Sequence, residues 1–178
     1  MRQRTSSRPK PTVGARRPQA TAASRPQATN ALDAGLRLLG RRAHSRVELR
    51  RKLRRKGYTD AEAETALSRL VELGYLDDQS FAEGLVRRRG AIRGPLALSA
   101  ELASRGVDRA HADAALAGFD AEAQLAAATR LAERLYARKP QAGYREMLNA
   151  IGSRLMRRGF SATIARAACR AALPGTED

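Results

Sequence analysis

The chain has 178 residues, of which 43% are hydrophobic but only 4% aromatic and none Trp, so aliphatic helix formers dominate and an all-α fold is predicted. A net charge of +16 and a pI of about 11.4 favour a polyanionic partner: nucleic acid, an acidic protein surface or anionic lipid. The lipid option is the weakest, because the mean hydropathy is −0.50 and no apolar run is long enough to cross a bilayer.

Residues 1–30 are predicted to form a disordered basic tail. The segment holds seven Arg and Lys residues, no acidic residue and four of the seven prolines of the chain, with almost no large apolar side chain to bury. It lacks the apolar stretch of a secretory signal. Two roles stay open: it adds non-specific affinity for a polyanion, or it is a dispensable extension. All acidic residues lie in 31–178, and that body is nevertheless basic.

Three stretches of the body align on a glycine, and each predicts one helix that ends there and a second that follows. The glycines are Gly57, Gly106 and Gly159, spaced 49 and 53 residues apart. Apolar residues stand eight and four positions before each glycine, on one face of a helix. Glycine ends that helix because it adopts a positive φ without a Cβ penalty. The predicted N-caps of the following helices are Thr59, Asp108 and Ser161.

One further helix precedes each pair, at about Ala31–Arg42, Ser80–Arg89 and Ala121–Arg138. Ser80 with Glu83 fits a capping box, and Gly94-Pro95 marks the next helix start. The chain is therefore predicted to form three tandem three-helix repeats in an elongated or curved array. We expect the repeats to span 31–78, 79–119 and 120–178.

The strongest basic element is the helix that leads to Gly57. Nine cations lie between Arg41 and Lys56, and only Glu48 offsets them in that stretch, so contact with a polyanion is predicted over a merely solvated basic face. Two more basic clusters follow, and phosphate contacts of this kind position a protein without reading sequence. The candidate contact residues are Arg46, Arg50, Arg51, Arg54, Arg55, Arg87, Arg88, Arg89, Arg93, Arg154, Arg157 and Arg158.

Residues suited to metal binding or catalysis are few. Cys169 is the only cysteine and is predicted to be a buried helical thiol, which fits a reducing cytoplasm. It is accompanied only by His44 and His111, without metal-ligand spacing. No pattern pairs a nucleophile with a base or forms a phosphate-binding glycine loop. We therefore expect no enzyme activity, no cofactor and no metal.

Two motifs resemble those of the RecX regulatory proteins. The first is Ser45-Arg46-Val47-Glu48-Leu49 with Lys52-Leu53 and Lys56-Gly57-Tyr58, and the second is Gly74-Tyr75-Leu76-Asp77-Asp78 followed by Ser80-Phe81-Ala82. Gly106 and Gly159-Phe160 fall where the second and third repeats of that family belong. The resemblance covers about 31–173 and leaves the basic tail unexplained.

The resemblance implies tandem three-helix repeats and a non-enzymatic task. Proteins of this family bind RecA, lie in the groove of its nucleoprotein filament, and limit strand exchange, ATP hydrolysis and repressor cleavage. The expected partners are the RecA filament and single-stranded DNA, with double-stranded DNA as a further option, all bound without sequence specificity. We expect a cytoplasmic monomer that contacts no membrane.

The alternative function is a helix-turn-helix protein that binds DNA without RecA. Against it, Asp60, Glu62 and Glu64 lie early in the helix that follows Gly57, where they would repel phosphates.

The second motif has two interpretations. Asp77 and Asp78 cap the helix that begins near Ser80, or they contact a partner, and both can hold. The apolar residues of the motif, Tyr75, Leu76 and Phe81, are expected to pack between repeats. The repeat-equivalent aromatics Tyr58 and Phe160 are expected in the core rather than in a base-stacking platform.

Overall fold

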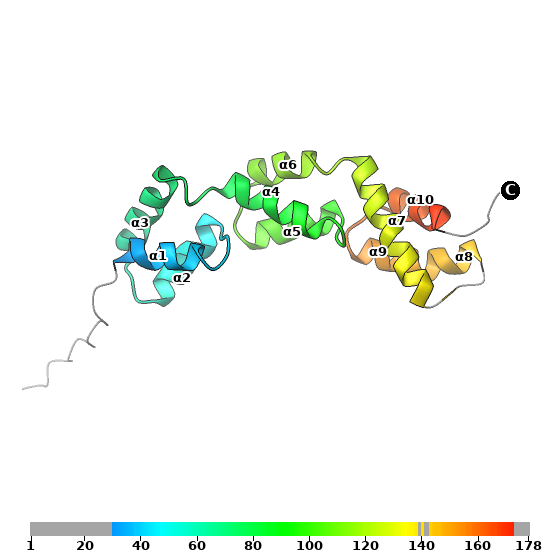
Figure 1. Cartoon of the computed structure of the whole chain (residues 1–178), viewed down its shortest axis with the longest axis horizontal. Helices are drawn as coiled ribbons and strands as arrows, with labels where there is room; N and C mark the ends of the chain where they lie inside the picture. The colour runs from blue at the N-terminus through cyan, green and yellow to red at the C-terminus, as the bar shows by residue number, and fades with distance from the viewer. Residues whose placement is uncertain (1–29, 139, 141–142, 173–178) are drawn as a thin grey trace, which may run out of the picture.

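The computed structural model describes residues 30–138, 140 and 143–172. Within these ranges every regular element is a helix and no strand occurs, so the predicted all-α fold is confirmed. The helices form three groups that follow one another along an elongated body (Figure 1). The tail predicted at 1–30 lies outside the described residues, apart from Asn30. The side chain of Asn30 caps the first helix by accepting a hydrogen bond from Asp33 N at 2.8 Å.

The first unit consists of three helices with their own core: α1 (Ala31–Leu39), α2 (Arg46–Arg55) and α3 (Asp60–Glu72). The apolar stripes of α2 and α3 meet in this core, where Leu49 and Leu67 are fully buried. Gly35 lets α1 approach α3 closely, because a Cβ atom there would lie 2.7 Å from Cδ1 of Leu70.

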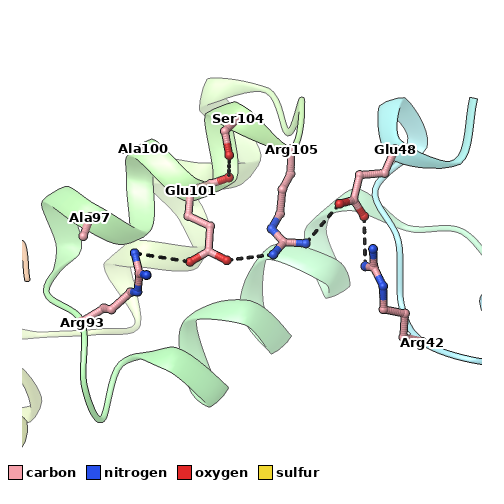
Figure 2. A pocket seen from close by; sticks show the side chains of 8 residues that line it. All are labelled: Arg42, Glu48, Arg93, Ala97, Ala100, Glu101, Ser104 and Arg105. Carbon is pink, nitrogen blue, oxygen red and sulfur yellow. Dashed lines mark hydrogen bonds and ion pairs between the residues drawn. The ribbon is translucent and has the colours of Figure 1, made fainter. Parts of the chain in front are cut away.

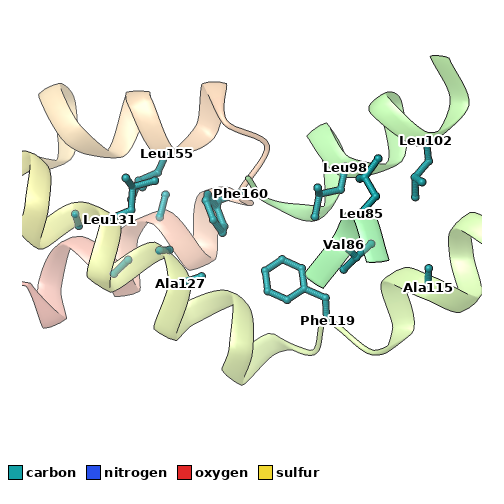
Figure 3. Packing of buried hydrophobic residues seen from close by; sticks show 14 of the residues in the cluster. Leu85, Val86, Leu98, Leu102, Ala115, Phe119, Ala127, Leu131, Leu155 and Phe160 are labelled. Atoms are coloured by element: carbon teal, nitrogen blue, oxygen red, sulfur yellow. The ribbon is translucent and has the colours of Figure 1, made fainter. Parts of the chain in front are cut away.

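The second unit consists of α4 (Asp78–Arg89), α5 (Pro95–Ser104) and α6 (Arg109–Ala117). The third unit consists of α7 (Ala121–Arg138), a middle helix, and α10 (Ala162–Ala171). That middle helix is continuous from α8 (Tyr144–Met147) through a π-helical segment (Leu148–Gly152) to α9 (Ser153–Arg157). Unlike the first unit, these two units share one core, to which Phe119 and Phe160 both belong (Figure 3).

The three glycine turns have the predicted backbone conformation. The φ angle is +91° at Gly57, +77° at Gly106 and +89° at Gly159. In each turn the N–H after the glycine donates to the carbonyl oxygen five residues earlier, as when Tyr58 N bonds Leu53 O at 3.3 Å. The predicted N-caps are confirmed as well: their side chains accept from a backbone N–H of α3, α6 and α10, and they are Thr59, Asp108 and Ser161.

Two predicted helix boundaries are wrong. The first helix ends at Leu39 rather than Arg42, because Gly40, a poor helix former, follows it. The fourth helix begins at Asp78 with Asp77 as its N-cap, so Ser80 lies inside the helix and forms no capping box with Glu83. The Ser80 hydroxyl instead donates to Asp77 Oδ2 at 2.6 Å, and Glu83 accepts from Gln79 at 2.7 Å.

Neighbouring units meet at two joints with equivalent geometry. In each joint, the first turn of one unit's middle helix lies against the glycine turn of the next unit. At the first joint, between the first and second units, the Ser45 hydroxyl donates to the carbonyl oxygen of Arg105. Val47 lies so close to the glycine turn of the second unit that a Cβ atom built on Gly106 would be 2.5 Å from the Cβ of Val47. The Arg46 N–H also donates to Asp78 Oδ1 at 2.8 Å across this joint.

The second joint, between the second and third units, repeats this arrangement with backbone groups. The Gly94 N–H donates to the carbonyl oxygen of Arg158 at 2.8 Å, and the Leu96 N–H donates to that of Gly159 at 3.2 Å. Ser45 and Gly94 both stand twelve residues before a glycine turn. The two joints are therefore built from matching positions of the repeat, although one uses a hydroxyl where the other uses a backbone amide.

Candidate nucleic-acid interface

The first joint carries a basic hollow on the surface. Two overlapping depressions of about 670 and 610 Å³ share Arg42, Glu101 and Arg105 as lining residues. Figure 2 shows the larger one, with Arg42 and Glu48 from the first unit facing Arg105, Glu101 and Arg93 from the second. We call this region the joint hollow, and its arginines are Arg42, Arg88, Arg89, Arg93 and Arg105.

Four local structures bring these arginines together. Arg42 lies in the connection between α1 and α2, while Arg88 and Arg89 lie in the last turn of α4. Arg93 lies in the loop that returns the chain to α5, where Pro95 at the first helical position fixes the start. Arg105 is the C-cap of α5, directly before the Gly106 turn that docks on the first unit.

Two glutamates partly neutralise the hollow. Glu48 contacts Arg42 Nη1 and Arg105 Nη1, both at 3.1 Å, and His44 Nδ1 at 3.2 Å. Glu101 contacts Arg105 Nη2 at 2.8 Å. With five arginines against two carboxylates, the hollow keeps a positive excess that attracts an anion.

The spare donors of the hollow belong to Arg89 and Arg93. Their guanidinium nitrogens lie 3.7 and 3.9 Å from the oxygens of Glu101, which is ion-pair distance but too long for a hydrogen bond. Oxygen Oε2 of Glu101 is buried and accepts no hydrogen bond from the described residues. The Glu101 carboxylate therefore attracts the guanidinium groups of Arg89 and Arg93, while the N–H groups of both arginines remain available to a ligand.

Burial and hydrogen bonding set the protonation of the acid–base pair at the edge of the hollow. Burial of His44 lowers its pKa below the ordinary value of 6.5, more than its hydrogen bond with Glu48 raises it. For Glu48, burial alone would raise the pKa, but the hydrogen bonds from Arg42 and His44 hold it below the ordinary 4.5. At neutral pH the pair is therefore an uncharged imidazole beside a carboxylate.

The arginines of α2 lie outside the joint hollow, and three of them form ion pairs with acidic side chains of α3. Arg46 and Arg50 both form ion pairs with Glu64 of α3, and Arg54 Nε lies 3.0 Å from Asp60 Oδ1. Glu48 is the only acid within the stretch from Arg41 to Lys56, but packing of α3 beside α2 supplies two further acids from beyond Gly57. Two further arginines of α2, Arg51 and Arg55, are exposed and form no ion pair with any of the described residues.

The remaining predicted arginines lie outside the hollow. Arg87 is exposed on α4, one position before the two arginines of that helix that do line the hollow. Arg154, Arg157 and Arg158 are exposed near the second joint, where Arg158 Nη1 donates to the carbonyl oxygen of Ile92 at 3.3 Å. The structure thus brings Arg88, Arg89 and Arg93 to one place and leaves the other predicted clusters apart.

The residues of the second motif connect the first two units. Asp77 caps α4 and Asp78 accepts the Arg46 N–H, so both aspartates serve the backbone around the first joint. Leu76 is buried in the first core and Phe81 in the second, where its ring lies 5.9 Å from the Arg105 guanidinium carbon. The expectation that Tyr75 packs between repeats is wrong, since it is 60% exposed.

Sequence reasoning missed two residues of the hollow, Arg42 and Arg105. A signal for the second was present, because a basic residue precedes the glycine in all three repeats: Lys56, Arg105 and Arg158. No local signal marks Arg42, whose role depends on where the second unit docks.

The remaining candidate groups are the Cys169 thiol and the side chains that could bind a metal ion. Cys169 is buried, as predicted, and burial raises the pKa of its thiol. Among the described residues no three His, Cys, Asp or Glu side chains are grouped so that they could hold a metal ion. No helix in the same part of the chain is long and apolar enough to cross a membrane.

The fold and the hollow define a class of protein: all-helical repeat proteins with a basic surface at the joints between units. Comparison with known families gives the particular family. The descriptions "RecX, first three-helix domain" and "RecX, second three-helix domain" match residues 31–70 and 77–116. The chain therefore belongs to the RecX family, and the resemblance found in its motifs is confirmed.

Individual relatives and solved structures agree. "Regulatory protein RecX" of Mycolicibacterium vanbaalenii is 42% identical over 139 residues, which is 73% of this chain and 75% of the relative. The protein of the same name from Halorhodospira halophila is 42% identical over 142 residues, 79% and 86% of the two chains. The crystal structure of RecX from Lactobacillus salivarius superposes with a TM-score of 0.72 at 26% identity, covering 80% of this chain and 94% of that one.

Proposed function

We propose that this chain is a non-enzymatic regulator that binds the RecA–single-stranded DNA filament and inhibits its recombinase, ATPase and coprotease activities. The observation that carries the proposal is the joint hollow: five arginines facing two glutamates at a junction of repeats, in a chain of the RecX family. It acts as a cytoplasmic monomer without cofactor and without contact to a membrane.

The hollow suits a sugar-phosphate backbone. Arginine donates two parallel hydrogen bonds to a phosphate, and the N–H groups of Arg89 and Arg93 are not used by Glu101. Such contacts do not distinguish bases, so binding without sequence preference follows. The exposed arginines Arg51, Arg55, Arg87, Arg154 and Arg157 are proposed as additional phosphate contacts along the array.

The test uses the single-strand-dependent ATPase of RecA with sub-stoichiometric amounts of this protein. Replacing Arg88, which is exposed, and Arg93, which is half-buried, by Gln removes two charges from the hollow without emptying a core position, so the fold should persist. We expect inhibition to weaken about tenfold or more, since one hydrogen bond to a charged group contributes about 1.5 kcal/mol. The matched control, Arg130→Gln with Arg134→Gln, removes two exposed charges from α7 and should inhibit like the wild type.

Two further measurements sharpen the result. Direct binding to oligothymidylate can be measured at several salt concentrations, and the logarithm of the affinity plotted against the logarithm of the salt concentration. The slope of this plot should become shallower by about 1.4 in the Arg88 and Arg93 variant, because each lost phosphate contact contributes about 0.7. RecA filament length in electron micrographs should decrease with the wild type and less with the variant. A folded Arg88 and Arg93 variant that inhibits as well as the wild type would contradict the proposal. A footprint on one defined duplex without RecA would favour the helix-turn-helix alternative.

A further inference from the structure

The two chain segments that meet at the second joint carry three exposed apolar side chains. Leu96, in the first turn of α5, is 69% exposed, and Ile92, in the preceding loop, is 36% exposed. Met156, in the last turn of α9 before the Gly159 turn, is 44% exposed. We call these three residues the joint patch. Large apolar side chains that gather on a surface mark interaction sites more often than ones scattered singly.

The backbone of the joint patch is held firmly. Besides the two hydrogen bonds of the second joint, the chain segments touch at glycines on both sides. A Cβ atom at Gly94 would lie 2.3 Å from the carbonyl carbon of Gly159, and one at Gly159 would lie 2.3 Å from Ala97 N. The patch is therefore a preformed surface made by two units, and a ligand that binds it need not order the backbone first.

The two segments that carry the joint patch are rich in arginine. Residues 87–100 and 147–172 contribute nine arginines and no Asp or Glu. Arg157 and Arg158 are exposed next to Met156, and Arg93 lies between Ile92 and Leu96 in the sequence. Glu101 and Glu146 directly flank these two segments, and among the described residues Glu101 is the carboxylate in ion-pair contact with Arg93. The charge around the patch thus fits an acidic partner.

The apolar side chains decide which kind of acidic partner fits. Single-stranded nucleic acid stacks its bases on exposed aromatic rings, whereas the joint patch offers only aliphatic side chains and a thioether. The nearest aromatic of the joint, Phe160, is 1% exposed and cannot serve as a platform. Protein interfaces, in contrast, bury aliphatic side chains and Met at their centre with charged residues at the rim.

The first joint does not offer the same surface. Its equivalent of Leu96 is Val47, a smaller side chain whose Cβ lies over Gly106, and its equivalent of Ala97 is Glu48. Glu48 pairs with Arg42 and Arg105, so the first joint presents a network of charged side chains at the position where the second joint has a small apolar one. The combination of Leu96, Ile92 and Met156 with neighbouring arginines is therefore found at the second joint and not at the first.

We propose that the joint patch, framed by Arg93, Arg157 and Arg158, is a docking site for an acidic peptide segment of a partner protein that carries a large aliphatic side chain. The aliphatic side chain covers Leu96 and Ile92, and carboxylates on either side of it pair with the arginines. This site shares Arg93 with the joint hollow and Arg157 with the phosphate contacts proposed along the array, but its apolar side chains belong to neither, so substitution of Leu96 tests it separately.

The test measures fluorescence anisotropy of labelled probes with the full-length chain. The first probe is a dodecapeptide of Glu and Ser that contains two Leu, the second is the same peptide with Ser for Leu, and the third is an oligothymidylate. We expect the Leu peptide to bind about tenfold more tightly than its Ser twin, as the burial of a Leu side chain predicts. Leu96→Ser should abolish that preference without changing the affinity for oligothymidylate.

The matched control is Val71→Ser, which removes an aliphatic side chain that is 45% exposed on the first unit, and should preserve the preference. Leu96 is the most exposed of these side chains, so its variant should fold, as circular dichroism will check. Equal binding of the two peptides by the wild type would overturn the proposal, and so would equal effects of the two Ser variants. Loss of oligothymidylate binding in Leu96→Ser would reassign the patch to nucleic acid.

Discussion

At the scale of single residues, the most informative group is the buried pair formed by His44 and Glu48. His44 is 3% exposed, and its imidazole shares the Glu48 carboxylate with the guanidinium groups of Arg42 and Arg105. This cluster ties the first unit to the second by charge rather than by apolar contact. Its stability therefore depends on protonation.

The direction of that pH dependence follows from the two pKa shifts. The folded chain holds the pKa of His44 below 6.5, so below that pH the unfolded chain binds more protons and stability falls. The folded chain also holds the pKa of Glu48 below 4.5, so its contribution is present above that pH and lost as pH falls further. Both groups destabilise the fold in acid.

We expect the free energy of unfolding, measured with urea, to decrease as pH is lowered from 6.5. His44→Gln removes the titrating group from this window, and its unfolding free energy should change less with pH than that of the wild type, even if the variant is less stable throughout. Equal slopes for the two proteins between pH 6.5 and 4.5 would show that His44 titrates alike in the folded and unfolded chains.

At the scale of elements, each glycine turn ends one helix and positions the next, and two of the three turns have a second task. The Gly57 turn has no neighbouring atom within 4 Å of the position of an added Cβ. The Gly106 and Gly159 turns, in contrast, are covered by the preceding unit, with contacts of 2.5 and 2.3 Å to a built Cβ. Helix ending and unit docking thus use the same residue.

This difference gives a prediction for two matched substitutions. Gly57→Ala should destabilise the fold by about 1–2 kcal/mol, the cost of a positive φ for a residue with a Cβ. Gly106→Ala should cost about 1–3 kcal/mol more, because the new methyl group overlaps Val47. Urea unfolding measures both values. In a double-mutant cycle Val47→Gly, which removes the Cβ that the new methyl group meets, should recover the excess at Gly106 but not the loss at Gly57, and absence of such coupling would contradict the docking geometry.

At the scale of the whole molecule, the two joints differ in what holds them. The second and third units share one apolar core, with Phe119 and Phe160 in it, so their joint is stabilised by burial. The first unit has a separate core that ends at Leu76, and its joint relies on the Glu48–Arg105 ion pair, short polar contacts and Val47. Because salt screens charges but not apolar contacts, the first unit should be the more easily displaced one.

Single-molecule energy transfer can measure that displacement. Dyes on Ala61→Cys and Glu133→Cys span both joints, and dyes on Ala110→Cys and Glu133→Cys span only the second, while buried Cys169 should not react. At about 1 M salt the first distance should broaden and the second should not. Arg105→Gln should broaden the first distance already at low salt. Identical behaviour of the two dye pairs would contradict a polar first joint.

The sequence by itself determined the features that depend on neighbours within one or two helical turns. Positive-φ glycines, N-caps and apolar stripes are local requirements of the backbone. The three-helix repeats, the burial of Cys169 and the family could therefore all be predicted from the sequence. The two misplaced helix ends also have local causes, because Gly40 ends the first helix before Arg42, and Asp77 caps α4 so that this helix begins at Asp78, with Ser80 inside it.

Only the tertiary structure decided which charges meet. Glu48 and Arg105 are 57 residues apart, and Arg46 and Glu64 are 18 apart, so no local pattern reveals that the first pair joins two units or that the second neutralises a basic row. Exposure of Tyr75 and Leu96 likewise depends on where neighbouring units end. The reason is that long-range electrostatic contacts and surface exposure are properties of docking between helices, whereas helix boundaries are properties of the backbone itself.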